Sequence, residues 1–273
     1  AFIGINAWGK TSVLKVILMA IDIANNEPIN HIATRDILGD TKNAVLNIFF
    51  YSESAKEVCK LETTIESKKT KTEGIVYRIV SEKLWSKQAD EITTRKTLLD
   101  FGWKEPVMVR SGKEDFLSDD VSIMIARNKK NGESISVVNL LLFTNINVLP
   151  ISEDIPAEII TFLDPAIESL RFVEKDKKTA IYLKFKGKEE IVLNNPVELN
   201  NYLSSGTVKG MITFTLAKEV LKSGGYMVVD ELENHFNKEI AATLMRFFMD
   251  SNLNKNGGVL IFSTHYPELL DEY

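Results

Sequence analysis

Eight residues near the start of the chain, Gly4 to Thr11, read GINAWGKT and fit the pattern G-x-x-x-x-G-K-S/T in full. They follow an apolar run, Phe2-Ile3, and precede SVLKVILMAIDIA, in which apolar residues recur at helical spacing. Glycines let such a loop turn its N–H groups toward phosphate oxygens, and the following helix adds the positive end of its dipole. The sequence therefore predicts an α/β fold with a phosphate-binding loop between a buried strand and a helix.

This loop assigns roles to individual residues. We expect Lys10 to reach the β- and γ-phosphates of a nucleotide and the hydroxyl of Thr11 to ligate Mg²⁺. The residues expected to bind the nucleotide are Gly4, Asn6, Ala7, Gly9, Lys10, Thr11 and Ser12. The alternative is a glycine turn that caps a core helix and leaves Lys10 on the surface.

A second apolar run, Tyr226 to Val229, ends in an Asp-Glu pair. Short apolar runs of this kind are typical of parallel strands that are buried on both faces. At the end of such a strand Asp230 is the expected carboxylate partner of Mg²⁺, and Glu231 is placed to polarise an attacking water. The alternative is that the pair opens a surface loop.

A third apolar run lies within residues 257–265, GGVLIFSTH, and ends in polar residues. We expect a helix between this run and the Asp-Glu pair, because apolar residues within 238–251 recur at helical spacing. His265 at the strand end is a candidate for a hydrogen bond to the γ-phosphate. A lone histidine is more often structural, so this assignment depends on the other motifs.

Residues 200–210, NNYLSSGTVKG, precede a further helical pattern. A helix N-terminus with small polar residues can receive an anion, so Ser204, Ser205 and Gly206 are candidates for phosphate contacts. The alternative is a plain N-cap, a position where serine is favoured.

The order of these elements resembles that of ABC-type ATPase heads, and more narrowly that of the RecF/SMC/OLD-like group of AAA-type ATPases. The motifs lie in about 1–25 and 200–270. The resemblance implies that two heads face each other around ATP, with Ser204, Ser205 and Gly206 acting on the ATP of the other head. It places the segment Leu232 to Asn237 at the dimer interface. It also implies the following roles: Lys10 on the phosphates, Asp230 on the Mg²⁺ side, Glu231 as catalytic base and His265 as the switch histidine.

Three positions depart from the pattern of this group. Ile5 stands where proline is frequent, and Trp8 is bulky where small residues are usual, so we expect Trp8 to pack on a neighbouring element. The glutamine of the family's Q-loop is not evident, because Gln88 lies in a charged segment that does not suit it. Other groups are therefore expected to supply the contacts of that loop.

The predicted fold class is α/β, a P-loop NTPase of the ABC-head type with a mixed or parallel core sheet, an antiparallel β-subdomain and a helical subdomain. We assign residues 1–273 to one ATPase domain, with a nucleotide-binding core from 1–43 and 200–273. Residues 44–85 read as strands with polar turns and predict the β-subdomain. Residues 86–200 are expected to mix helices and strands, including a hairpin over 179–193. Its lysines are candidates for DNA contacts, although a solvated hairpin face is the preferred interpretation.

Composition narrows the function classes. The net charge of −5 argues against a general nucleic-acid-coating role without excluding a local basic groove. A single cysteine, Cys59, rules out an intrachain disulfide and a cysteine metal cluster. No apolar run approaches the length of a membrane span, so we expect a cytoplasmic protein. We also expect sequence to be missing at both ends, because the chain begins inside an apolar run and stops where OLD proteins continue into a nuclease domain.

These features predict an ATP- and Mg²⁺-dependent ATPase that forms a homodimer or a higher homo-oligomer. Its expected role is a switch that controls a separate effector, a nuclease or toxin, in bacterial anti-phage defence. The alternative is a DNA-repair or chromosome-maintenance ATPase that clamps DNA, which the lack of a long heptad run disfavours. A transporter subunit is disfavoured as well, because its signature would normally read LSGGQ rather than LSSGT.

Overall fold

The computed structural model describes residues 1–3, 9–70, 74–112, 114, 117–141, 155–175, 178–234 and 236–269. The chain forms two compact units. The first, which we call the core unit, comprises residues Ala1–Leu14 and Ser136–Tyr273, and the second, the β-unit, comprises Lys15–Ile135. No helix in the described ranges combines the length and the apolar character that crossing a bilayer requires.

The core unit is built around a four-stranded sheet in the order β1-β11-β10-β6. Its strands are β1 (Phe2–Ile3), β6 (Val137–Asn139), β10 (Tyr226–Val229) and β11 (Val259–Thr264). All its neighbouring strands pair in parallel, with Ile3 opposite Thr264 and Val229 opposite Phe262. Parallel strands carry their carboxyl ends to one edge of a sheet, which is where ligands bind in such folds. The predicted strands that end before Asp230 and His265 are confirmed, and they are neighbours.

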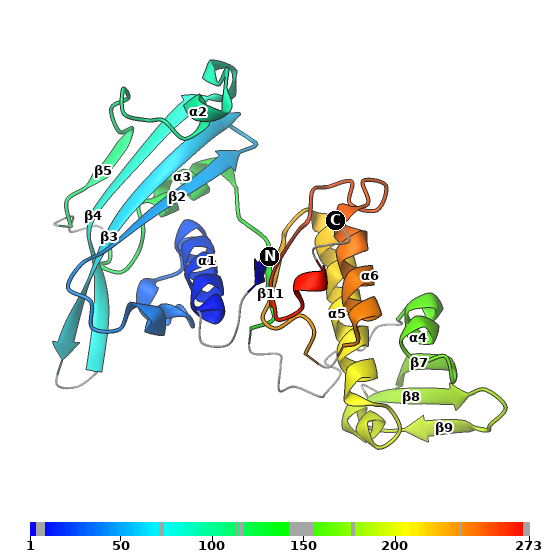
Figure 1. Cartoon of the computed structure of the whole chain (residues 1–273). Helices are drawn as coiled ribbons and strands as arrows, with labels where there is room; N and C mark the ends of the chain where they lie inside the picture. The colour runs from blue at the N-terminus through cyan, green and yellow to red at the C-terminus, as the bar shows by residue number, and fades with distance from the viewer. Residues whose placement is uncertain are drawn as a thin grey trace. The chain divides into compact units, whose positions relative to one another are not determined.

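Helices α5 (Ser205–Ser223) and α6 (Lys238–Met249) pack against this sheet (Figure 1). Their shared cluster contains Phe214 and Ala217 of α5, Leu244 of α6 and Met227 of β10, all almost fully buried. A third helix, α1 (Lys10–Ala24), begins directly after Gly9. The turn from α5 into β10 needs glycine, since Gly224 ends the helix at a φ of +76° and a Cβ at Gly225 would lie 2.7 Å from the Ser136 carbonyl oxygen.

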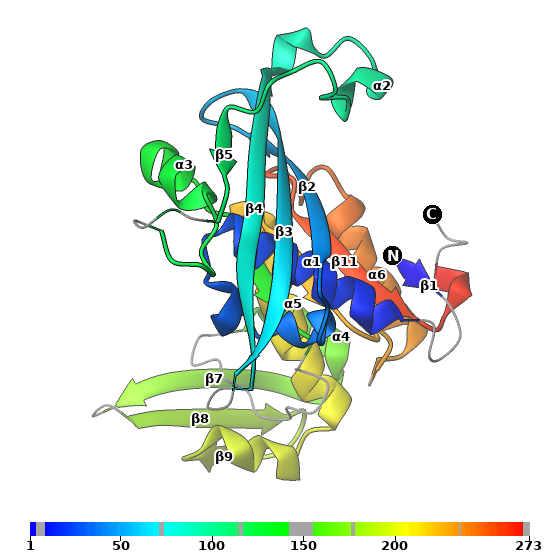
Figure 2. The same cartoon turned by 90° about the vertical axis from the view of Figure 1, so that its left-hand side faces the viewer.

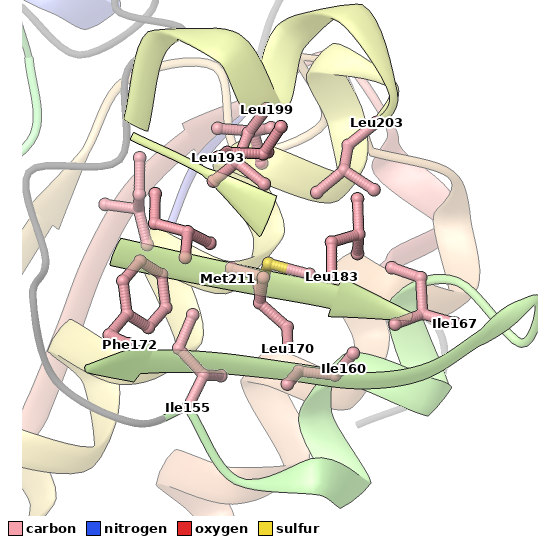
Figure 3. Close-up of a cluster of buried hydrophobic side chains, with 13 residues drawn as sticks. Ile155, Ile160, Ile167, Leu170, Phe172, Leu183, Leu193, Leu199, Leu203 and Met211 are labelled. Atoms are coloured by element: carbon pink, nitrogen blue, oxygen red, sulfur yellow. The ribbon is translucent and has the colours of Figure 1, made fainter. Parts of the chain in front are cut away.

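A smaller antiparallel sheet in the core unit has the order β7-β8-β9. Its strands are β7 (Ile167–Lys175), β8 (Lys178–Phe185) and β9 (Glu190–Leu193), so the hairpin predicted over 179–193 is confirmed. One face of this sheet packs on α4 (Ala157–Leu163), on the 3₁₀ turn Pro196–Asn201 and on Met211 of α5 (Figure 3). Two ion pairs form between strands of this sheet. Lys184 contacts Glu168 at 2.7 Å, and Arg171 contacts Glu190 at 2.6 Å.

The β-unit contains an antiparallel sheet in the order β2-β3-β4-β5 (Figure 2). The strands are β2 (Ala44–Ser52), β3 (Glu57–Thr70), β4 (Gly74–Gln88) and β5 (Met108–Arg110). The antiparallel strands predicted over 44–85 are therefore present, and β5 is an additional strand. The short helices are α2 (Arg95–Leu98) and α3 (Met124–Asn131), with 3₁₀ turns at Ile29–His31, Arg35–Leu38 and Ala89–Glu91. The core of this unit joins Met19 and Ile23 of α1 to the inner face of the sheet.

The chain is thus a mixed α/β protein with one parallel sheet and two antiparallel sheets among its described residues. Over about 86–200 these residues form short helices and strands rather than a helical bundle. Gln88 ends β4, where its side chain contacts Glu57 at 3.1 Å. This contact lies within the β-unit.

Candidate nucleotide-binding site

The end of the glycine loop and the first turn of α1 carry the predicted phosphate-binding residues that the structure describes. Gly9 has a φ of +76°, a backbone conformation that favours glycine, and its carbonyl oxygen accepts the Val13 N–H at 3.0 Å. The helix therefore starts at Lys10, with Lys10, Thr11 and Ser12 in its first turn. Gly4, Asn6 and Ala7 lie outside the described residues, as does Trp8.

Thr11 and Asp230, the two residues expected at the Mg²⁺ position, are in direct contact. The Thr11 hydroxyl donates to Oδ2 of Asp230 at 2.6 Å. Ser263, which is fully buried in β11, donates its own hydroxyl to Oδ1 of the same carboxylate and accepts the Glu231 N–H at 2.8 Å. Ser263 thus fixes the orientation of Asp230, because the carboxylate is held at both oxygens. Sequence reasoning missed Ser263, because its contacts depend on the register of β11 against β10.

The donor set fits Mg²⁺. Magnesium prefers hard oxygen ligands, and at nucleotide sites one or two protein groups commonly complete a shell made of phosphate oxygens and water. A threonine hydroxyl and a carboxylate that already lie 2.6 Å apart suit that arrangement. The described residues contain no group of three or more histidine, cysteine, aspartate or glutamate side chains that could hold a metal by themselves.

Lys10, His265 and Glu231 form a second group beside the first. The Lys10 ammonium lies 3.2 Å from Nδ1 of His265, and Nε2 of the same ring lies 3.6 Å from Oε1 of Glu231. An ammonium only donates, so this contact requires Nδ1 to accept and assigns the ring hydrogen of a neutral His265 to Nε2. The N–H edge of the imidazole then faces the carboxylate that is expected to act as the base.

The turn after β10 holds Glu231 in an uncommon backbone conformation. Its φ is +49°, which few residues other than glycine adopt and which is often found at functional sites. The turn is secured on both sides, since the Leu232 N–H donates to the Ser263 carbonyl at 2.9 Å and the Asn234 N–H to the Glu231 carbonyl at 2.7 Å. The exposed Glu231 side chain is therefore presented from a fixed main chain.

Glu233 in the same turn contacts the residue after β11. Its Oε1 accepts the main-chain N–H of His265 at 2.5 Å, while Oε2 is buried and has no hydrogen-bond partner among the described residues. The expected interface segment Leu232 to Asn237 also contains Asn237, which caps α6 by accepting the Ile240 N–H at 2.9 Å. His235 lies outside the described residues. Sequence reasoning placed Glu233 in this segment without giving it a role.

Ser204, Ser205 and Gly206 lie at the N-terminus of α5. Ser204 is the N-cap, and its hydroxyl accepts the Thr207 N–H at 3.0 Å. Within this chain Ser204 therefore acts as the plain N-cap that was the alternative interpretation. No hydrogen bond among the described residues joins these three to Lys10, Thr11 or Asp230. The contacts within one chain do not test the expected role of these residues toward a second chain.

One further lysine lies near the carboxylates. Lys209 of α5 is buried, and burial lowers the pKa of its amine. A small pocket is lined by Leu140, Lys209, Thr213, Val229, Asp230, Glu231, Leu232, Asn234 and Phe236. From α5, Lys209 and Thr213 line this pocket opposite the carboxylate turn.

The sequence matches one known family. Residues 1–271 match the family that is described as "AAA domain, putative AbiEii toxin, Type IV TA system". No curated protein matches the chain. The family match covers both motif-bearing ends as well as the middle of the chain.

Proposed function

We propose that this chain, which belongs to that AAA-domain family of P-loop ATPases, binds Mg-ATP at the carboxyl edge of its parallel sheet and hydrolyses it to ADP and phosphate. The observation that carries the proposal is the convergence of two contact groups at this edge. One joins Thr11 to Asp230, and the other joins Lys10 through His265 to Glu231. Each group combines a residue of the glycine-loop helix with one that follows a core strand.

The residues divide the work by chemistry. The Thr11 hydroxyl, on the side of Asp230, would hold Mg²⁺. The bound ion would neutralise charge on the phosphates. Lys10 binds the β- and γ-phosphates together with the loop Gly4 to Gly9. Glu231 orients and polarises a water, since its carboxylate is exposed and its main chain is fixed. His265 lies between Lys10 and Glu231, and its Nε2–H is the ring donor that can reach the γ-phosphate.

We further propose that hydrolysis requires a second copy of the chain. Ser204, Ser205 and Gly206 start a long helix and make no hydrogen bond to the phosphate-binding residues of their own chain among the residues described. In a head-to-head homodimer the N-terminus of α5 would meet the γ-phosphate bound by the other copy, where its dipole favours negative charge.

The family description names a toxin and a type IV toxin–antitoxin system. This supports a proposal in which the ATP-dependent state of the dimer controls a toxic effector in bacterial defence. Lys184 of the hairpin β8–β9 gives little support to the DNA-clamping alternative, because it contacts Glu168 at 2.7 Å.

The experiment that tests the proposed activity compares two lysines of the same helix. The purified protein should hydrolyse Mg-ATP, and Lys10→Ala should lose both ATP binding and at least about a hundredfold of the rate, because the phosphates lose their positive partner. Lys15→Ala is the control, since Lys15 makes an ion pair with Asp36 at 2.7 Å and is not expected at the phosphates. ATP hydrolysis by Lys10→Ala at the wild-type rate would overturn the proposal.

A further inference from the structure

We propose that Glu233 is a positioning residue whose carboxylate anchors the main chain of His265, so that the imidazole lies between Lys10 and Glu231. The contact joins the turn after β10 to the residue after β11. The consequence for catalysis rests on the proposed ATPase function. The anchoring contact itself is present in the protein without nucleotide.

The hydrogen bond that carries this inference is short and charge-assisted. Oε1 of Glu233 lies 2.5 Å from the His265 nitrogen, and hydrogen bonds to carboxylates are about twice as strong as those between neutral groups. His265 is the first residue after β11, whose last sheet partner is Ile3 opposite Thr264. The Glu233 side chain therefore supplies an acceptor at the point where the strand ladder has ended.

The rest of the turn makes Glu233 a stable anchor. Its own carbonyl accepts the Phe236 N–H at 2.9 Å, and the preceding residue, Leu232, is buried in the cluster between the sheet and α6. The Leu232 N–H also donates to the Ser263 carbonyl, two residues before His265. The Glu233 side chain thus adds to the contacts that Ser263 already makes between β11 and the turn after β10.

The second carboxylate oxygen indicates that the acid has a specific role here. Oε2 of Glu233 is buried and has no hydrogen-bond donor among the described residues, an arrangement that lowers stability. Packing alone would favour an apolar side chain at this place. The presence of a glutamate at position 233 is explained if the site requires its strong hydrogen bond to the His265 N–H.

Both edges of the anchored ring face groups that the proposed reaction uses. Nδ1 accepts from Lys10 at 3.2 Å, and Nε2 faces Glu231 at 3.6 Å. Freeing the main chain of His265 would let the ring leave this position, and a displacement of about 1 Å near reacting groups can lower a rate by about a hundredfold.

The first test measures the tautomer of the His265 ring in the protein without nucleotide. Ring-nitrogen NMR signals of His265, identified by their loss in His265→Ala, should show the hydrogen on Nε2 in the wild type. Glu233→Gln keeps an acceptor and should retain this state, whereas Glu233→Ala should give a mixture of tautomers. Glu239→Ala, which removes an exposed acid of α6 paired with Arg246, is the control. Unchanged His265 signals in a folded Glu233→Ala protein would refute the anchoring.

The second test asks whether Glu233 acts through His265. In ATP hydrolysis, Glu233→Ala should lower kcat about tenfold with little change in KM, and Glu233→Gln should recover most of the loss. In the His265→Ala background, Glu233→Ala should have no further effect, because the ring that it positions is gone. Full additivity of the two losses would contradict the proposal. A wild type that does not hydrolyse ATP would refute the proposed function, and the ring signals would still decide on the anchor.

Discussion

At the scale of single residues, the site is organised by side chains that hold other side chains. Ser263 is the clearest case, because its hydroxyl contacts the carboxylate of Asp230 and the main chain of Glu231 at once. Residues of this kind lie behind the expected ligands, and they determine where the ligands point. They are also the residues that motif patterns describe least well.

Replacing Ser263 by alanine should weaken the response to Mg²⁺ more than the binding of ATP. Asp230 would lose the donor at Oδ1 and keep only the Thr11 hydroxyl at Oδ2. Loss of such a supporting contact typically lowers metal affinity 10- to 100-fold, so the Mg²⁺ concentration for half-maximal hydrolysis should rise by about tenfold or more. Ser223→Ala at the end of α5 is the matched control. An unchanged Mg²⁺ dependence would show that Ser263 does not position Asp230.

A second residue-scale prediction concerns Glu82 in the β-unit. Burial raises the pKa of this carboxyl, against the donors Ile123 N–H, Thr63 and Ser122 that lower it. A raised pKa means that the folded state binds the proton more tightly than the unfolded state. The stabilising effect of that proton is therefore present below about pH 4.5, the ordinary value, and is lost as the pH rises through the folded value.

Glu82→Gln removes this titration. The free energy of unfolding of the wild type, relative to Glu82→Gln, should therefore fall as the pH is raised from about 4 toward neutrality. Urea unfolding followed by tryptophan fluorescence at several pH values measures the difference, with Glu62→Gln on β3 as the control. A wild type that gains stability over the glutamine variant with rising pH would show that the pKa is shifted the other way.

At the scale of elements, α5 has two structural tasks. Its first half packs Val208, Met211 and Ile212 against the small sheet, and its second half packs Phe214, Ala217 and Val220 against the parallel sheet. The helix therefore ties the two sheets of the core unit together. Its N-terminus, which Ser204 caps, is the part proposed to act on a second chain.

The two roles of Ser204 can be separated by substitution. Ser204→Ala removes the cap and should lower the free energy of unfolding by about 1 kcal/mol. Ser204→Asp preserves the cap, since aspartate is an equally good N-cap residue, but it adds a negative charge where the γ-phosphate of the other chain is expected. We therefore expect normal stability and loss of ATP-dependent dimerisation for Ser204→Asp. Thermal unfolding and mass in solution with ATP measure the two effects, and an Asp variant that dimerises normally would argue against the role in trans.

At the scale of the whole molecule, strand order explains why distant motifs meet. Ile3, Val229 and Thr264 end three parallel strands that are consecutive in the sheet, so the residues that follow them share one edge. The apolar runs and their polar ends were enough to predict this arrangement, because parallel strands are buried and their loops collect on one side. The antiparallel strands of the β-unit were predictable for the same kind of reason, from alternation and turns.

Other features depend on packing that no local pattern encodes. The contacts of Ser263 and Glu233 arise from the register of β10 against β11, and a shift of one residue would place different side chains there. The pairing of β5 with β4 and the burial of Lys209 likewise follow from tertiary contacts. The assignment of one domain to residues 1–273 and the role of each site residue remain predictions.

The measurement that tests the central claim most directly is the mass of Glu231→Gln in solution with and without Mg-ATP. Glutamine removes the expected base and retains the size of the side chain, so ATP should bind without being hydrolysed and should hold two copies together. The account predicts a dimer or larger assembly that forms with Mg-ATP and is absent with ADP. A protein that binds Mg-ATP and stays at the mass of a single chain would contradict it.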